Sequence, residues 1–273
     1  MTIHTPELSR RDGWVTVASR IEFAAADIEL PKKLWFRFPE EFAPYVTDRA
    51  DGFVSLLVSL AMRIGEPIEV RGKLSPRLLY GLREYQSALL SWKPPGYRRV
   101  EIRCNQLEPA PKGEFQTGVV TPFSGGVDST YTLWAHLPRN QPLVDFQVTH
   151  ALYVQGVDVS LDDENTMGEI LERHSALFSR LNIEFIPAAS NHYPFAAYRE
   201  WITFRSGLFT AAVVQVLGRR FRRLISTGNL CYNDVVRKSR SPATDYLFST
   251  ETLEVVHHGS GARRYEKLAS LAT

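Results

Sequence analysis

The feature that most constrains this chain is a glycine-containing turn at residues 124–129, between an apolar stretch and a helix-like stretch. Residues 118–120 are Gly-Val-Val, and such β-branched residues favour a buried strand. Residues 131–137 are compatible with one or two turns of helix. A strand that leads through a Gly-Gly turn into a helix is typical of a phosphate-binding site.

The residue types in this turn suit a bound phosphate group. Gly125 and Gly126 allow the backbone to turn sharply and to come close to a ligand. The first N–H groups of a helix have no partner within the helix and point toward an anion. Ser124 and Ser129 add hydroxyl donors. Because Asp128 cannot bind phosphate directly, we expect it to bind Mg²⁺, which bridges phosphate oxygens.

The turn differs from two common nucleotide-binding patterns. The common phosphate loop needs a lysine and then Ser or Thr after its second glycine, but no lysine occurs between Lys112 and Lys238. The turn also lacks the G-x-G-x-x-G pattern of dinucleotide-binding folds. A Gly-Gly turn that serines cap without any ligand remains the structural alternative.

The turn resembles the Ser-Gly-Gly-x-Asp-Ser loop of the PP-loop ATP pyrophosphatases, which include GMP synthetase, asparagine synthetase, the deazaguanine nitrile synthases and thiolation enzymes. The resemblance implies that ATP and Mg²⁺ are the cofactors, with Asp128 as the metal ligand. It also implies that ATP contacts all six matching residues: Ser124, Gly125, Gly126, Val127, Asp128 and Ser129.

The length of 273 residues predicts one large domain or one domain with an appendage. In residues 1–112 we expect an N-terminal α+β subdomain, with strands at 14–17 and 34–38 that alternate apolar and polar side chains. Asp51 is predicted to cap one helix of this subdomain, and Ser75 is predicted to cap a second helix that Pro76 begins.

Residues 113–273 are predicted to form an α/β domain, because strand-like and helix-like stretches alternate. Further strands are expected at 146–154, 183–186 and 223–227, with helices at 161–181 and 198–217. This alternation predicts a doubly wound parallel sheet of Rossmann-like, PP-loop type, with helices on both faces. Ligands of such sheets lie at the carboxyl ends of the strands, where the strand order reverses.

Two further stretches end at the same predicted edge of the sheet. In the PP-loop family, backbone near the end of the second strand holds adenine, which implies Tyr153 and Val154 here. A later glycine-containing loop approaches the nucleotide, which implies Gly228. The alternative for both stretches is an ordinary loop between a strand and a helix.

Basic residues offer additional anion contacts. Arg205 lies in an apolar stretch, and a buried arginine needs an anionic partner, either an Asp or an ATP phosphate. Lys238 belongs to a turn-rich basic loop that could close over the triphosphate and neutralise pyrophosphate as it leaves. We expect Lys267, in the last helix, to be exposed to solvent, and His257 and His258 to be structural.

The resemblance implies that a carbonyl or carboxylate oxygen of a small molecule attacks the α-phosphate of ATP and releases pyrophosphate. A nitrogen nucleophile then displaces AMP, which makes the chain an amide-type ligase. Free ammonia, an amine or a donor protein would supply the nitrogen, because the chain leaves no room for a glutaminase. The zinc-binding cysteine cluster of the deazaguanine nitrile synthases is missing, since the chain has two cysteines.

Two other functions stay open. One is ATP-dependent sulfur transfer by a sulfurtransferase to a nucleobase-like or other carbonyl substrate, through Cys231 or Cys104, with a sulfur-donor protein as partner. Cys231 lies near basic residues that favour a thiolate, whereas Cys104 alternates with apolar residues as core side chains do. The other is a nucleotide-binding protein without turnover.

The composition restricts the partners and the location. The 32 basic and 30 acidic residues give a net charge of +2, which neither requires nor excludes a nucleic-acid partner. The chain has no apolar run of about 18 residues that could span a membrane and no signal peptide. We therefore expect a cytoplasmic protein that acts on a small molecule, and we expect it to form a homo-oligomer.

Overall fold

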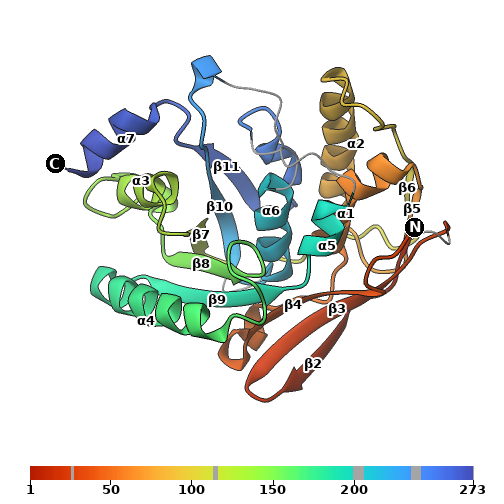
Figure 1. Cartoon of the computed structure of the whole chain (residues 1–273), viewed down its shortest axis with the longest axis horizontal. Helices are drawn as coiled ribbons and strands as arrows, with labels where there is room; N and C mark the ends of the chain where they lie inside the picture. Colours follow the sequence, from red (N-terminus) through yellow and green to blue (C-terminus); the bar gives the residue numbers. More distant parts are fainter. Residues whose placement is uncertain (26–27, 113–115, 199–205, 235–240, 273) are drawn as a thin grey trace.

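A computed structural model gives the fold of the chain and describes residues 1–25, 28–112, 116–198, 206–234 and 241–272. The protein has an α/β fold, in which one mostly parallel sheet of eleven strands is flanked by helices (Figure 1). Ten of the strands follow one another in the order β11-β10-β7-β8-β9-β4-β3-β1-β5-β6, and β2 pairs with β3.

Five parallel strands form the half of the sheet that carries the 124–129 turn. They are β7 (Gly118–Pro122), β8 (His150–Gln155), β9 (Glu184–Ser190), β10 (Phe221–Thr227) and β11 (Glu254–His258). The chain moves outward from β7 to β8 and β9, and then crosses back to place β10 on the other side of β7. The strand order therefore reverses between β7 and β10, as the sequence predicted for a doubly wound sheet.

Helices cover both faces of this half of the sheet. They are α3 (Val127–Ala135), α4 (Glu164–Leu181), α5 (Tyr193–Ala197), α6 (Ser206–Val216) and α7 (Arg264–Leu271). Successive residues of β7 face opposite sides, as in any strand. Val119 packs in a core cluster with residues of α3 and α4, whereas Val120 belongs to the larger core cluster that contains α6.

The N-terminal segment continues the same sheet. Its strands are β1 (Thr2–Ile3), β2 (Glu7–Arg11), β3 (Trp14–Glu22), β4 (Lys33–Pro39), β5 (Ile68–Val70) and β6 (Ile102–Cys104). Strand β4 pairs antiparallel with β9, where Phe36 lies opposite Ser190. The helix α1 (Asp51–Ile64) packs against α6, and one core cluster includes residues of both segments. The predicted division into two domains at residue 112 stays a prediction.

Of the two helix caps predicted in this segment, one is confirmed and one is wrong. Ser75 caps α2 (Pro76–Ser91) as predicted, because its hydroxyl accepts a hydrogen bond of 3.0 Å from the N–H of Leu78. The prediction that Asp51 caps α1 is wrong, since Ala50 occupies the cap position. The buried Asp51 carboxylate instead accepts hydrogen bonds from Arg49 Nε and from the N–H of Ser75, so tertiary partners determine its place.

The remaining elements differ from prediction mainly at their ends. The strand expected at 146–154 begins at His150, because Val144–Phe146 forms a turn of 3-10 helix. The helix expected at 198–217 is described from Ser206 to Val216, and Arg205 lies outside the described residues.

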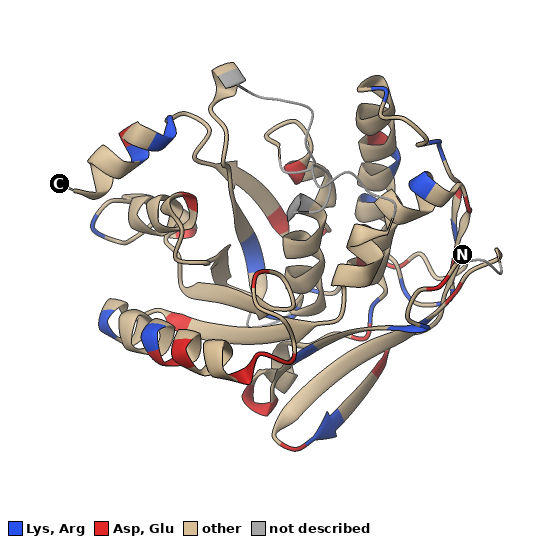
Figure 2. Ribbon diagram, in the orientation of Figure 1, with Lys and Arg blue, Asp and Glu red and all other residues tan. Residues whose placement is uncertain are grey.

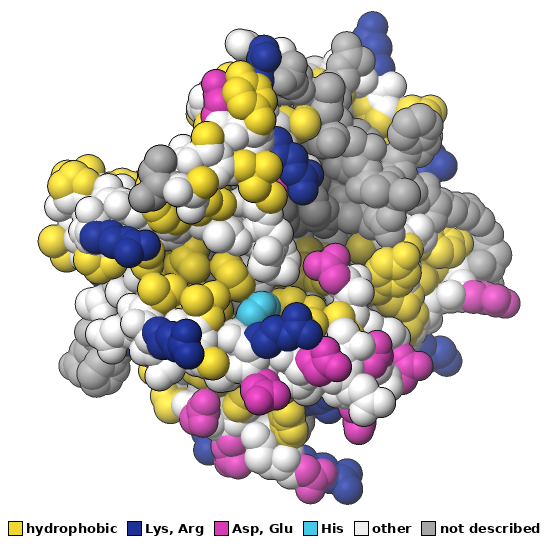
Figure 3. All heavy atoms as spheres, turned by 60° about the vertical axis from the view of Figure 1, so that its left-hand side comes forward, with side chains coloured by type: hydrophobic (Ala, Val, Ile, Leu, Met, Phe, Trp, Pro, Cys, Tyr) yellow, Lys and Arg dark blue, Asp and Glu magenta, His cyan; other side chains and the backbone are white. Residues whose placement is uncertain are grey.

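Charged residues are spread over the whole fold. Figure 2 shows that Lys and Arg alternate with Asp and Glu on α4 and occur on the strands of both segments. Figure 3, which brings the side of α3 and α7 forward, shows apolar side chains in the middle of this face with charged side chains around them. Across the described ranges, no helix combines the length and the apolar character needed to cross a membrane.

Candidate functional site

The 124–129 turn lies where the strand order reverses, between the end of β7 at Pro122 and the start of α3 at Val127. Gly125 has a φ angle of +76°, which glycine adopts without the strain that a side chain causes. The Ser129 hydroxyl donates to the carbonyl of Gly126 at 2.9 Å and accepts from the N–H of Ser124 at 3.3 Å. These bonds fold the turn back onto the first turn of α3.

The start of α3 keeps N–H groups available to a ligand. Gly126 is the cap residue, and no side chain among the described residues caps the helix. The first hydrogen bond of the helix runs from the N–H of Thr130 to the carbonyl of Gly126. Within the described part of the chain, the N–H groups of the first turn of α3, from Val127 to Ser129, therefore stay available to an anion, and the helix dipole adds to the attraction.

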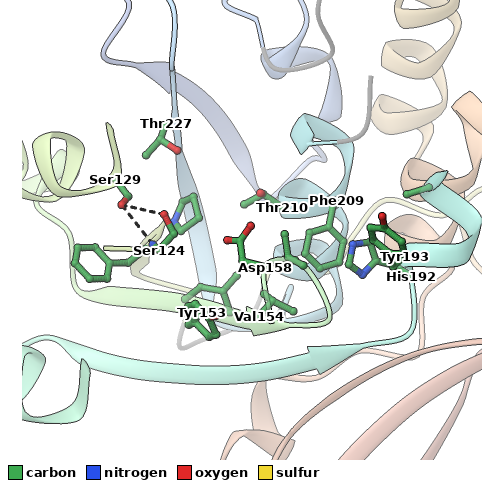
Figure 4. Close-up of a pocket in the computed structure, with 15 residues that line it drawn as sticks. Ser124, Ser129, Tyr153, Val154, Asp158, His192, Tyr193, Phe209, Thr210 and Thr227 are labelled. Atoms are coloured by element: carbon green, nitrogen blue, oxygen red, sulfur yellow. Dashed lines mark hydrogen bonds between the residues drawn. The ribbon is translucent and has the colours of Figure 1, made fainter. Parts of the chain in front are cut away.

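A cavity of about 400 Å³ lies beside the turn. Ser124 and Ser129 lie at one end of it, whereas His192, Tyr193 and Phe209 lie at the other end (Figure 4). Its described lining is Pro122, Phe123, Ser124, Ser129, Leu152, Tyr153, Val154, Val157, Asp158, His192, Tyr193, Ala196, Phe209, Thr210 and Thr227. Four residues predicted to contact ATP, namely the two serines, Tyr153 and Val154, therefore meet at one cavity.

The far end of the cavity contains residues that the sequence did not single out. The rings of His192 and Phe209 stack with their centroids 3.6 Å apart. Among the residues that line the cavity in the described part of the chain, Asp158 is the one Asp, Glu, Lys or Arg. Burial raises the pKa of the Tyr153 hydroxyl, and the nearby Asp158 carboxylate raises it further. No periodicity in the sequence pointed to Asp158, His192, Tyr193 or Phe209, because they come from the loop after β8, from the start of α5 and from α6.

Asp128 lies in the first turn of α3 and forms an ion pair with a lysine of the last helix. Lys267 Nζ donates to Asp128 Oδ1 at 2.7 Å and to the carbonyl of Gly228 at 2.7 Å. The side chain of Lys267 is only 1% exposed, so the expectation that it is solvated is wrong. The physical reason is that α7 packs against α3, which places Lys267 between α3 and the end of β10.

The residues around Asp128 fit a magnesium ion held mainly by nucleotide. Among the described residues, no three His, Cys, Asp or Glu side chains gather as a metal site. Asp128 Oδ1 accepts the bond from Lys267, so Oδ2 is the oxygen left for a metal. Mg²⁺ typically binds one or two carboxylates, phosphate oxygens and several waters, so a single carboxylate oxygen suits it.

Gly228 follows β10 and closes the floor of the site without lining the cavity. Its N–H donates to the carbonyl of His258 at 2.6 Å, and its carbonyl accepts from Lys267. Beneath it, His257 contacts the Ser260 hydroxyl through Nε2 at 2.7 Å and Asp245 through Nδ1 at 2.8 Å. These are the contacts of a catalytic triad, but Ser260 is only 2% exposed.

The second histidine of this strand is half-buried and uncharged. Burial, together with the nearby His136, Lys267 and His257, lowers the pKa of His258 to about 3. Its ring stacks on Tyr131 and its Nδ1 lies 3.1 Å from the hydroxyl of Thr132. His257 and His258 therefore serve as packing and hydrogen-bonding residues in this structure.

The two cysteines lie in different places. Cys231 is half-buried after Gly228, in a loop that the Tyr232 N–H ties to the carbonyl of Ser260, and it does not line the cavity. Cys104 lies in β6, at the far edge of the sheet from β11, so the N-terminal segment does not bring it to the site. Burial raises the pKa of the Cys104 thiol, which disfavours a thiolate. Lys238 lies outside the described residues.

Comparisons of the chain with protein-family models, with curated proteins and with solved structures found no match. A proposal about the chemistry of the site therefore rests on the residues of the site and on the resemblance of the 124–129 turn to the PP-loop.

Proposed function

We propose that this protein is an ATP-dependent enzyme of the PP-loop type that adenylates an oxygen of a small molecule. The observation that carries the proposal is the position of the Ser-Gly-Gly-Val-Asp-Ser turn. It opens a helix at the point where the strand order of the sheet reverses, beside a cavity. This is where doubly wound sheets bind nucleotides.

In this proposal the residues of the turn hold the triphosphate. The free N–H groups at the start of α3 and the hydroxyls of Ser124 and Ser129 bind phosphate oxygens. The cavity wall at Tyr153 and Val154 receives the adenine. Asp128 Oδ2 would hold Mg²⁺, and the metal would supply positive charge to neutralise the phosphates. The enzyme thus acts by positioning its reactants and by stabilising the charge of the leaving pyrophosphate.

The proposed reaction has two steps, each of which balances. First, the substrate oxygen bonds to the α-phosphorus of ATP while the bond from that phosphorus to the bridging oxygen breaks, which releases pyrophosphate. Second, a nitrogen nucleophile bonds to the activated carbon, loses a proton and displaces AMP. Adenylation makes the substrate oxygen a good leaving group, and no side chain of the turn needs to act as a nucleophile.

Sulfur transfer is the alternative, and the location of the cysteines restricts it to Cys231. This residue lies three positions after Gly228, close to the end of β10, whereas Cys104 is at the opposite edge of the sheet. Replacement of Cys231 by serine separates the two reactions. Nitrogen transfer predicts little change in product formation, whereas sulfur transfer predicts its loss.

The proposed function is tested by identifying the nucleotide products by mass spectrometry. Purified protein would be incubated with Mg²⁺, ATP and a pool of nucleobases, carboxylic acids, ammonia and sulfide, with Asp128→Ala as the comparison. We expect AMP and pyrophosphate from the wild-type protein and at least about 100-fold less from the variant, because the metal ligand is lost. ADP and phosphate as products, or equal turnover by Asp128→Ala, would contradict the proposal.

A further inference from the structure

The ion pair between Asp128 and Lys267 connects three elements that are distant in the sequence. Lys267 comes from α7, Asp128 from the first turn of α3, and the carbonyl of Gly228 from the end of β10. The Lys267 ammonium also lies 5.9 Å from the centre of the Tyr131 ring, within reach of a cation–π interaction. The amine therefore holds a carboxylate of the first turn of α3, the same turn whose N–H groups form the candidate phosphate site.

The surroundings of Lys267 are built to keep this amine in one place. Its side chain is 1% exposed, and a buried ammonium is stable only with a charged partner and further hydrogen bonds. Gly259, which lies next to the amine, has a φ angle of +97°. Glycine adopts this angle without strain, so it lets the chain turn beside Lys267.

We propose that Lys267 is a positioning residue of the nucleotide site, which fixes the Asp128 carboxylate so that only Oδ2 is presented to a metal. This inference deepens the proposed function and rests on it. One carboxylate oxygen stays bound to the amine, so the carboxylate cannot rotate or bind a metal with both oxygens. The ion pair would then lower the affinity of the site for the metal and improve the orientation of the metal-bound phosphates.

If Lys267 has this role, removal of its charge should change metal binding and AMP formation in opposite directions. The amine and the metal share one carboxylate, so the positive charge of Lys267 opposes metal binding. Lys267→Met should therefore bind Mg²⁺ together with nucleotide more tightly, and yet form AMP more slowly because Asp128 is free to turn. A purely structural ion pair predicts lower stability with an unchanged metal dependence.

The test is calorimetric titration with α,β-methylene-ATP, which cannot release pyrophosphate, at a series of Mg²⁺ concentrations. We expect the half-saturating Mg²⁺ concentration of Lys267→Met to fall about five-fold or more, while AMP formation with ATP falls about 100-fold. Arg264→Met is the matched control, because it removes the same charge from an exposed position of the same helix. It should match the wild-type protein in both measurements.

A second variant protects the test against a failure to fold. Lys267→Gln removes the charge but keeps an N–H donor for the carbonyl of Gly228, and it should shift the Mg²⁺ dependence in the same direction. One result would overturn this inference alone. In it, the wild-type protein binds the nucleotide, but the folded variants have a half-saturating Mg²⁺ concentration that is equal to or higher than that of the wild-type protein. No binding of α,β-methylene-ATP by the wild-type protein at any Mg²⁺ concentration overturns the proposed function as well.

Discussion

At the scale of single residues, buried polar contacts determine the shape of the site floor. Gly228 lies directly over the hydrogen bond between His257 and Ser260, and its carbonyl accepts from Lys267. Nothing larger than a hydrogen atom fits there, because a Cβ on Gly228 would lie 2.5 Å from His257 Nε2 and 2.8 Å from Ser260 Oγ. The residue that the sequence suggested for nucleotide contact thus has a packing role as well.

Gly228→Ala should destabilise the fold because the added methyl group must displace His257 or Ser260. Overpacking of this kind costs about 1–3 kcal/mol, and urea unfolding measures it. Gly168→Ala is the control: Gly168 lies within α4, and a Cβ there meets no atom within 4 Å. Alanine should stabilise that helix by about 0.5–1 kcal/mol. Equal stability of Gly228→Ala and the wild-type protein would contradict the described packing.

The sequence predicted residues whose role is local and missed those whose role depends on packing. The Ser75 cap and the Gly-Gly turn are read from neighbours along the chain, so both could be placed before the structure. Asp51 was predicted to act locally, but it binds Arg49 and the N–H of Ser75 instead. Lys267 was predicted to be solvated on the surface of the last helix, but the packing of α7 on α3 buries it.

At the scale of elements, strand order places the site. The reversal between β7 and β10 brings the ends of both strands together, so Ser124 and Thr227 line one cavity although about 100 residues separate them. The alternation of strands and helices was enough to predict this arrangement. The pairing of β4 with β9 was not predicted, because a strand sequence does not specify which edge it joins.

The α2 helix provides a test at this scale. Ser75→Ala removes the cap of its first turn, where the hydroxyl accepts from the N–H of Leu78. We expect a loss of about 1 kcal/mol in the free energy of unfolding. Ser91→Ala at the exposed end of the same helix should change it by less than about 0.5 kcal/mol. The cap assignment fails if the two variants are equally stable.

At the scale of the whole molecule, the buried His150 and the half-buried His258 connect stability to pH. Burial, with the charge of Arg220 nearby, lowers the pKa of His150 to about 3, and the pKa of His258 is also about 3. In the unfolded chain both return to about 6.5. The unfolded state therefore binds more protons between these values, and the folded state loses stability as the pH falls from about 6.5 toward 3.

This loss should be visible in urea unfolding at pH 7.0, 6.0, 5.0 and 4.5. Well below pH 6.5, each histidine contributes a slope of at most about 1.4 kcal/mol per pH unit. His258→Phe should show a shallower decline than the wild-type protein, since one of the two titrating groups is gone. If the variant declined as steeply as the wild-type protein, His258 would not be held neutral in the folded state.

The central claim is that the turn at 124–129 holds the triphosphate of ATP, and a crystal structure with Mg²⁺ and α,β-methylene-ATP tests it most directly. The account predicts phosphate oxygens within hydrogen-bond distance of the N–H groups at the start of α3. It also predicts the metal on Asp128 Oδ2 and the adenine beside Tyr153 and Val154. An ordered nucleotide bound elsewhere, with the turn free of phosphate, would contradict the claim.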